Sequence, residues 1–127
     1  MGGVAGVRPT EVVIIGAGTA GEYAAKSALG LGATVKVFDY SSHRLRAIQD
    51  HVGQRISTSF IEPKELSKSL MRCDVAIGAL YHQGRMPNVV SEAMVTRMKS
   101  GSVVVDLSIN HGGCFETSEM TTHENPT

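Results

Sequence analysis

Short apolar runs alternate along the chain with longer segments in which apolar residues recur every three or four positions. Runs rich in valine and isoleucine are typical of buried strands, whereas the spaced pattern is typical of amphipathic helices. The runs predict five strands, at 11–16, 34–40, 55–60, 74–80 and 102–109.

The spaced segments also carry signals for where a helix begins and ends. Gly32 stands where a helix C-terminal glycine belongs, Pro63 suits a first helical position, and Ser91 can cap the segment after it. Ser41 and Ser42 each offer a cap for the segment that follows them. The pattern predicts helices at 19–32, 43–52, 63–72 and 92–100.

Strands separated by helices form βαβ units, which give a parallel sheet with right-handed crossovers. We therefore predict a single α/β domain over 1–127, a Rossmann-type doubly wound sheet of order 3-2-1-4-5 with flanking helices. Residues 1–9 are expected to be an entry linker. The polar stretch 115–127 is expected to be either a loose tail or a segment ordered by something absent from this chain.

Composition narrows the classes of function. The 127 residues suit one domain, and 12 basic residues balance 12 acidic ones, which argues against a nucleic-acid partner. No apolar run reaches membrane-spanning length, and the start lacks a signal-peptide pattern. The two cysteines, Cys73 and Cys114, are not spaced as a disulfide framework or zinc site. We expect a cytoplasmic protein with no membrane contact.

A glycine motif follows the first predicted strand. Gly16, Gly18 and Gly21 form GxGxxG between a strand and a helix, the context in which this spacing binds a dinucleotide. Gly16 permits the tight turn, Gly18 lets the backbone approach a pyrophosphate, and Gly21 allows close packing of helix and strand. The amides of Thr19, Ala20 and Gly21 would point at the phosphates from the helix N-terminus. The alternative is a glycine-rich turn without a ligand.

Asp39 ends the second predicted strand. Its spacing from the glycine motif is the one at which an acid accepts hydrogen bonds from the hydroxyls of the adenosine ribose. A carboxylate there would repel a 2′-phosphate, which favours NAD over NADP as the cofactor. Arg44 lies close by and is interpreted as an adenine-stacking or solvent residue. The alternative for Asp39 is a turn or helix-capping aspartate.

Other candidates for chemistry are weaker. His111 follows the fifth strand and could serve as a general acid or base, although a loop histidine is more often solvated. His43, His51 and His82 are expected in solvent, and no histidine pair has the HExxH spacing, so no metal site is predicted. Cys114 is interpreted as a small apolar residue.

Two segments resemble the cofactor domain of alanine dehydrogenases, a family related to the NAD-binding component of nicotinamide nucleotide transhydrogenase. The first is "GGVAGVRPTEVVIIGAGTAGEYAAKSALGLGATVKVFDYSSHRLRAI", and the second is "KSGSVVVDLSINHGGCFETSEMTTHENPT". The resemblance covers essentially the entire chain. "GGCFETS" and "TTHENPT" are similar to the dehydrogenase branch, because transhydrogenases diverge there.

The resemblance implies NAD-dependent oxidative deamination of L-alanine to pyruvate and ammonia by a two-domain subunit, commonly assembled as a hexamer. It implies that this chain is an excised cofactor domain, whose partner is the catalytic domain of the same polypeptide, and that the fragment binds NAD without turnover. That domain would order the tail 115–127. The residues that match the family's NAD contacts are Gly16, Ala17, Gly18, Thr19, Ala20, Gly21, Asp39, Arg44, Ala79, Leu80, Leu107, Ser108, Ile109 and Asn110.

The chain departs from the family in three ways. The family's substrate-binding Arg and Lys and its catalytic His lie in a preceding segment that is absent here. The family's catalytic Asp in "IDQGG" is matched by Asn110 in "INHGG", and an amide cannot accept a proton as a carboxylate does. The loop 81–88 is shorter than its family counterpart. Two alternative functions are therefore kept: a transhydrogenase NAD-binding component, and a non-catalytic nucleotide-binding module.

Overall fold

The computed structural model describes residues 9–53, 56–80, 90–107 and 123–124. Strands and helices alternate through most of this length, as the apolar pattern predicts. The elements are β1 (Glu11–Ile15), α1 (Thr19–Gly30), β2 (Thr34–Asp39), α2 (Ser42–Val52), β3 (Ile56–Phe60), α3 (Pro63–Arg72), β4 (Val75–Gly78), α4 (Glu92–Thr96), β5 (Val103–Asp106) and β6 (His123–Glu124).

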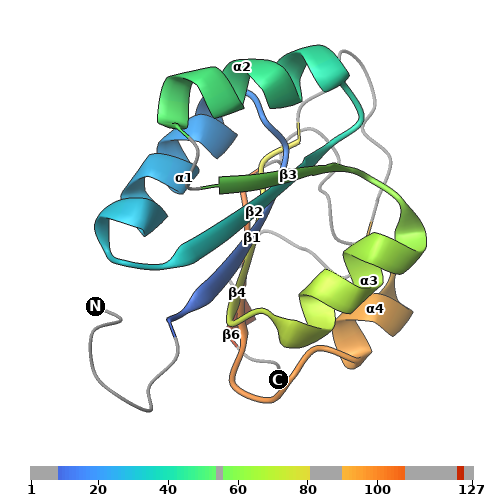
Figure 1. Ribbon diagram of the computed structural model, residues 1–127. Helices are drawn as coiled ribbons and strands as arrows, with labels where there is room; N and C mark the ends of the chain where they lie inside the picture. The colour runs from blue at the N-terminus through green and yellow to red at the C-terminus, as the bar shows by residue number, and fades with distance from the viewer. Residues whose placement is uncertain (1–8, 54–55, 81–89, 108–122, 125–127) are drawn as a thin grey trace.

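The strands form one sheet of order β3-β2-β1-β4-β5-β6. The first five are parallel to one another, which confirms the predicted order 3-2-1-4-5. Helices α1 and α2 cover one face of the sheet, and α3 and α4 cover the other (Figure 1). The fold is therefore the predicted doubly wound α/β sheet, and β1 and β4 meet where the chain reverses its direction of winding.

The core has two halves because β1 is buried on both faces. Val12 and Ile14 pack beneath α1 and α2, whereas Val13 and Ile15 pack on the α3 and α4 side. Ile14 and Ile15 are fully buried. Burial of an isoleucine side chain stabilises a fold by about 1.5–3 kcal/mol, so this strand is a large contributor to stability.

Helix starts follow the predicted signals. Ser41 rather than Ser42 caps α2, because the Ser41 hydroxyl accepts from the Arg44 amide at 3.2 Å. Ser91 caps α4 in the same way, through the Met94 amide at 3.2 Å. The predicted glycine at the end of α1 is also confirmed, since Gly32 has a φ of 87°.

Besides element ends that differ from the predicted bounds, such as α1 ending at Gly30 and β4 at Gly78, two features differ from the sequence predictions. Helix α4 ends at Thr96, because the chain tightens into turns in which the Met98 amide donates to the Val95 carbonyl at 3.0 Å. The polar tail contributes β6, which pairs antiparallel with β5 and was not predicted. A two-residue strand has too little pattern to be recognised in a sequence.

Candidate functional site

The glycine motif forms the turn from β1 into α1, and two of its glycines are required by packing. Gly16 has a φ of 122°, and a Cβ atom there would lie 2.5 Å from the Ala79 carbonyl carbon and 2.6 Å from the Leu80 nitrogen. A Cβ at Gly21 would collide with the Gly16 carbonyl. Both glycines therefore allow backbone segments to touch where a side chain would hold them apart.

Gly18 differs from its neighbours, because a Cβ built on it would meet nothing within 4 Å. Its φ of −86° is one that other residues adopt readily. Nothing in the described protein therefore requires glycine at this position. The open space above Gly18 is where an approaching pyrophosphate would need the backbone bare, so the turn fits the dinucleotide that its spacing predicts.

The turn is held at the carboxyl end of β2. The Gly16 amide donates to the Phe38 carbonyl at 2.7 Å, and the Ala17 amide donates to Asp39 Oδ2 at 2.8 Å. Thr19 and Ala20 are exposed in the first turn of α1. The first amides of a helix lack partners inside the helix, and they carry a partial positive charge that favours a bound anion.

Asp39 is buried, with 1% of its surface exposed. Besides the Ala17 amide, its carboxylate accepts from the Ser41 amide at 2.9 Å, through Oδ1. Arg44 Nη1 lies 3.9 Å from Oδ2. Asp39 is thus a turn aspartate, the alternative considered from sequence, and it also ties the glycine turn to the β2–α2 turn. An ionised carboxylate has about four acceptor positions, so two backbone donors do not exhaust it.

Glu22 introduces a negative charge into the first turn of α1, and two side chains form hydrogen bonds or ion pairs with its carboxylate. Its carboxylate lies 3.0 Å from His51 Nδ1 and 3.2 Å from Lys26 Nζ. The hydrogen bond with His51 is the main cause that lowers the pKa of Glu22 below its ordinary value, and the bond with Lys26 is the second. His51, which was expected in solvent, is exposed but joins the end of α2 to α1.

The remaining residues that match the family's NAD contacts follow β4 and β5, beyond the point where the direction of winding reverses between β1 and β4. Ala79 and Leu80 are buried directly after β4, and the Ala79 amide donates to the Ile15 carbonyl at 2.7 Å. Leu107 is exposed after β5, its amide 2.6 Å from the Gly78 carbonyl. Several sequence candidates lie outside the described residues: Ser108, Ile109, Asn110, His82, His111 and Cys114.

The structure thus gathers Gly16–Gly21, Asp39, Ala79–Leu80 and Leu107 along the carboxyl ends of four adjacent strands. This is the edge at which doubly wound sheets bind their ligands. Sequence reasoning missed that Asp39 braces the glycine turn, because that contact joins residues far apart in the chain. The only available signal was an aspartate at the end of a strand, whose carboxylate can accept a hydrogen bond from an earlier turn.

Sequence reasoning also missed a polar clamp at the amino ends of the strands. Asp74 Oδ2 accepts from the Glu11 amide at 2.8 Å, and Asp74 Oδ1 lies 2.8 Å from Lys99 Nζ. The clamp joins β1, β4 and the segment before β5 at the edge opposite the glycine turn. We assign it to stability.

Across the parts of the chain with described positions, His, Cys, Asp and Glu form no group of three suited to a metal ion. In those same parts, no helix combines the length and apolar character needed to cross a bilayer.

Comparisons with known proteins agree with this architecture. The family described as "Alanine dehydrogenase/PNT, C-terminal domain" matches residues 1–127. The alanine dehydrogenase of Mycolicibacterium smegmatis is 48% identical over 128 residues, covering 100% of this chain and 34% of that protein. The chain thus spans about a third of the length of the curated relatives it matches.

Solved structures give the same result. An L-alanine dehydrogenase matches with a TM-score of 0.87 and 40% identity, over 98% of this chain and 35% of the other. The transhydrogenase from Sinorhizobium meliloti matches with a TM-score of 0.75 and 29% identity, over 89% of this chain and 34% of the other. By sequence and by fold, this chain belongs to the family of alanine dehydrogenase and PNT C-terminal domains.

Proposed function

We propose that the chain binds NAD across the carboxyl edge of its sheet, with the pyrophosphate against the turn Gly16–Gly21. The observation that carries this proposal is the contrast within the motif. Gly16 and Gly21 are explained by contacts inside the protein, whereas Gly18 faces open space. The amides at the start of α1 would donate to the phosphate oxygens, and the helix dipole would favour their negative charge.

Asp39 would accept a hydrogen bond from a hydroxyl of the adenosine ribose. It would therefore favour NAD over NADP as the cofactor. Its carboxylate already holds the Ala17 and Ser41 amides, so its position is fixed before the cofactor arrives. The Arg44 guanidinium lies 3.9 Å from this carboxylate with its side chain 44% exposed, and it would have to move aside for the ribose. A 2′-phosphate would meet the buried negative charge instead, which opposes NADP.

The substrate proposal concerns the whole protein. We propose a parent that oxidises L-alanine to pyruvate and ammonia, because the relatives that span this chain are alanine dehydrogenases. NAD, when bound, supplies the hydride acceptor. This chain would hold the cofactor and exclude water beside Ala79 and Leu80, while the substrate would be held by the part of the parent that this chain does not span. The isolated chain would not turn over.

The finer assignments follow from the same resemblance. The parent would work in the cytoplasm as a homo-oligomer, a hexamer in the family, in contact with its own catalytic domain. Cys73 is a free, buried thiol, and free thiols are the usual state of cysteines in a reducing compartment.

A second candidate is the NAD-binding component of a transhydrogenase, which the fold similarity to the Sinorhizobium meliloti structure supports. The two parents differ in the acceptor of the hydride. An alanine dehydrogenase reduces NAD only when L-alanine is added, whereas a transhydrogenase exchanges hydride between NAD(H) and NADP(H) without an amino acid. Measuring both reactions with the full-length parent separates the two assignments.

Nucleotide binding itself is tested with a matched pair of glycine variants. Gly18→Ala should weaken NADH binding at least about tenfold, since a methyl group would occupy the space needed by the phosphates. Its folding should change by less than about 1 kcal/mol, because the methyl group meets no protein atom. Gly30→Ala is the control, because its Cβ also meets nothing but lies at the far end of α1.

The readout is NADH fluorescence titration, with urea unfolding of each variant. Equal NADH affinities for Gly18→Ala and Gly30→Ala would show that the glycine turn does not hold the cofactor.

A further inference from the structure

Arg44 and Asp39 bring opposite charges together beside the place proposed for the adenosine ribose. Arg44 Nη1 lies 3.9 Å from Asp39 Oδ2. The two side chains differ in their contact with solvent, because Asp39 is buried whereas the side chain of Arg44 is 44% exposed. The pair therefore joins an enclosed anion to a cation that solvent reaches.

The Asp39 carboxylate is fixed, because backbone amides hold both of its oxygens. Oδ2 accepts from the Ala17 amide at 2.8 Å, and Oδ1 accepts from the Ser41 amide at 2.9 Å. The negative charge of Asp39 therefore stays in place whichever nucleotide approaches. Acting alone, this carboxylate would exclude a 2′-phosphate, since two anions repel each other strongly where water is scarce.

The backbone of Arg44 is fixed as well, but its guanidinium is held less tightly to Asp39. The Arg44 amide donates to the Ser41 hydroxyl at 3.2 Å in the first turn of α2. The 3.9 Å between Nη1 and Oδ2 is an ion-pair distance, because N–H···O hydrogen bonds are roughly 3 Å long. The guanidinium can therefore move relative to Asp39 while the helix keeps its Cα atom beside the ribose site.

A 2′-phosphate on the ribose would carry close to two negative charges. Arginine binds phosphate through parallel N–H donors, and this geometry suits the group better than a point charge does. The structure places Arg44 against the very carboxylate that would repel the phosphate. Its guanidinium is therefore positioned both to bind the phosphate and to offset the charge of Asp39.

We propose that Arg44 sets how far this domain discriminates between NAD and NADP. With NAD, Asp39 holds the ribose and Arg44 moves aside. With NADP, the guanidinium contacts the 2′-phosphate, so that the binding of this cofactor is weakened and not abolished. The inference rests on the proposed function. It differs from the adenine-stacking interpretation of Arg44, because adenine is common to both cofactors.

A charge series at position 44 tests this role, with NADH and NADPH titrated separately by calorimetry. The wild type should bind NADPH within about a hundredfold of NADH. Arg44→Gln should raise the ratio of the NADPH to the NADH dissociation constant at least about tenfold, because the lost contact is with the phosphate alone. Arg44→Lys, which keeps the charge, should raise the ratio less than Arg44→Gln does, and Arg44→Glu should raise it more.

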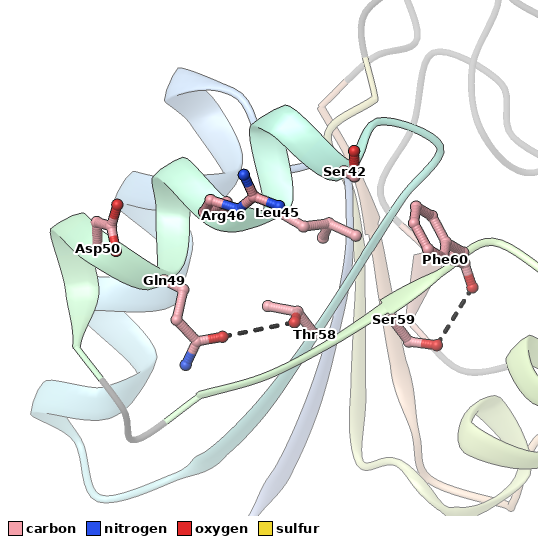
Figure 2. A pocket seen from close by; sticks show the side chains of 8 residues that line it. All are labelled: Ser42, Leu45, Arg46, Gln49, Asp50, Thr58, Ser59 and Phe60. Atoms are coloured by element: carbon pink, nitrogen blue, oxygen red, sulfur yellow. Dashed lines mark hydrogen bonds between the residues drawn. The ribbon is translucent and has the colours of Figure 1, made fainter.

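Arg46→Gln is the matched control. Arg46 is an exposed cation two residues further along α2, and it lines the groove between α2 and β3 together with Gln49 and Thr58 (Figure 2). Residues two apart on a helix do not face the same side. Arg46→Gln should therefore keep the ratio within about twofold of the wild type, as a screened charge away from the phosphate does. Circular dichroism of each variant separates a changed fold from a changed site.

A wild-type chain that binds NADH but no NADPH overturns the inference. An Arg44→Gln variant that weakens both nucleotides by the same factor also overturns it, since an adenine-stacking side chain would give that result. So does a variant that leaves both affinities unchanged. In each of these cases the proposed NAD binding is unaffected. A wild type that binds neither nucleotide refutes the proposed function itself, and this inference with it.

Discussion

Single atoms decide what the glycine turn can do. The hydrogen atoms that replace a side chain at Gly16 and Gly21 let β1, β4 and α1 approach one another, and the one at Gly18 leaves open space. The spacing of the motif could be read from the sequence, and so could the close packing that Gly16 and Gly21 allow. The bond from the Ala17 amide to Asp39 could not, because it depends on where β2 ends relative to β1.

Asn110 stands where the family that this chain resembles carries an aspartate. Asn110→Asp in the full-length parent restores a group that can carry negative charge and accept a proton, so alanine oxidation should rise. Steady-state kcat with saturating L-alanine and NAD measures the effect. An unchanged or lower kcat would mean that the asparagine is adapted to its site.

Cys73 is predicted to be inert in the folded chain. The thiol is fully buried, and this burial is the first cause that raises its pKa to about 12. The reactive thiolate is therefore scarce at ordinary pH. In a Cys114→Ser background, a disulfide reagent at pH 8 should label Cys73 rapidly in urea and only at the rate of unfolding in buffer. Rapid labelling of the folded chain would contradict the burial.

At the scale of elements, periodicity predicted most of the molecule. Leu66 and Leu70, one helical turn apart in sequence, are both buried beneath α3, and the bounds of that helix match the prediction. The length of helix α4 was overestimated, because Val95 and Thr96 are weaker helix formers and the chain then turns toward β5. The strand β6 was missed, because it is defined by its partner β5 and not by any pattern of its own.

The contact between α1 and α2 should make stability depend on pH. Glu22 has a lowered pKa in the folded chain, so its contribution is present above the ordinary value of 4.5 and is lost as pH falls through the lowered value. The wild type should therefore have a higher urea midpoint than Glu22→Gln at pH 6, and the gap between the two midpoints should be narrower at pH 3. His51→Gln should remove much of the difference, since His51 is the main cause of the shift. A gap of equal size at both pH values would contradict this account.

At the scale of the whole molecule, the sequence predicted the fold class and strand order because each βαβ unit is locally encoded and crossovers have one hand. The position of the carboxyl edge, at which we propose that NAD binds, followed from that order. The groove between α2 and β3 did not, because a groove depends on how far a helix stands from an edge strand.

The central claim is that this domain holds NAD through its glycine turn and discriminates through Asp39. Isothermal titration calorimetry of the chain with NADH and with NADPH tests both parts. The account predicts that NADH binds at least about tenfold more tightly, equivalent to ~1.4 kcal/mol, because the buried carboxylate accepts from a ribose hydroxyl and repels a 2′-phosphate. Equal affinities, tighter binding of NADPH, or no binding of either nucleotide would contradict it.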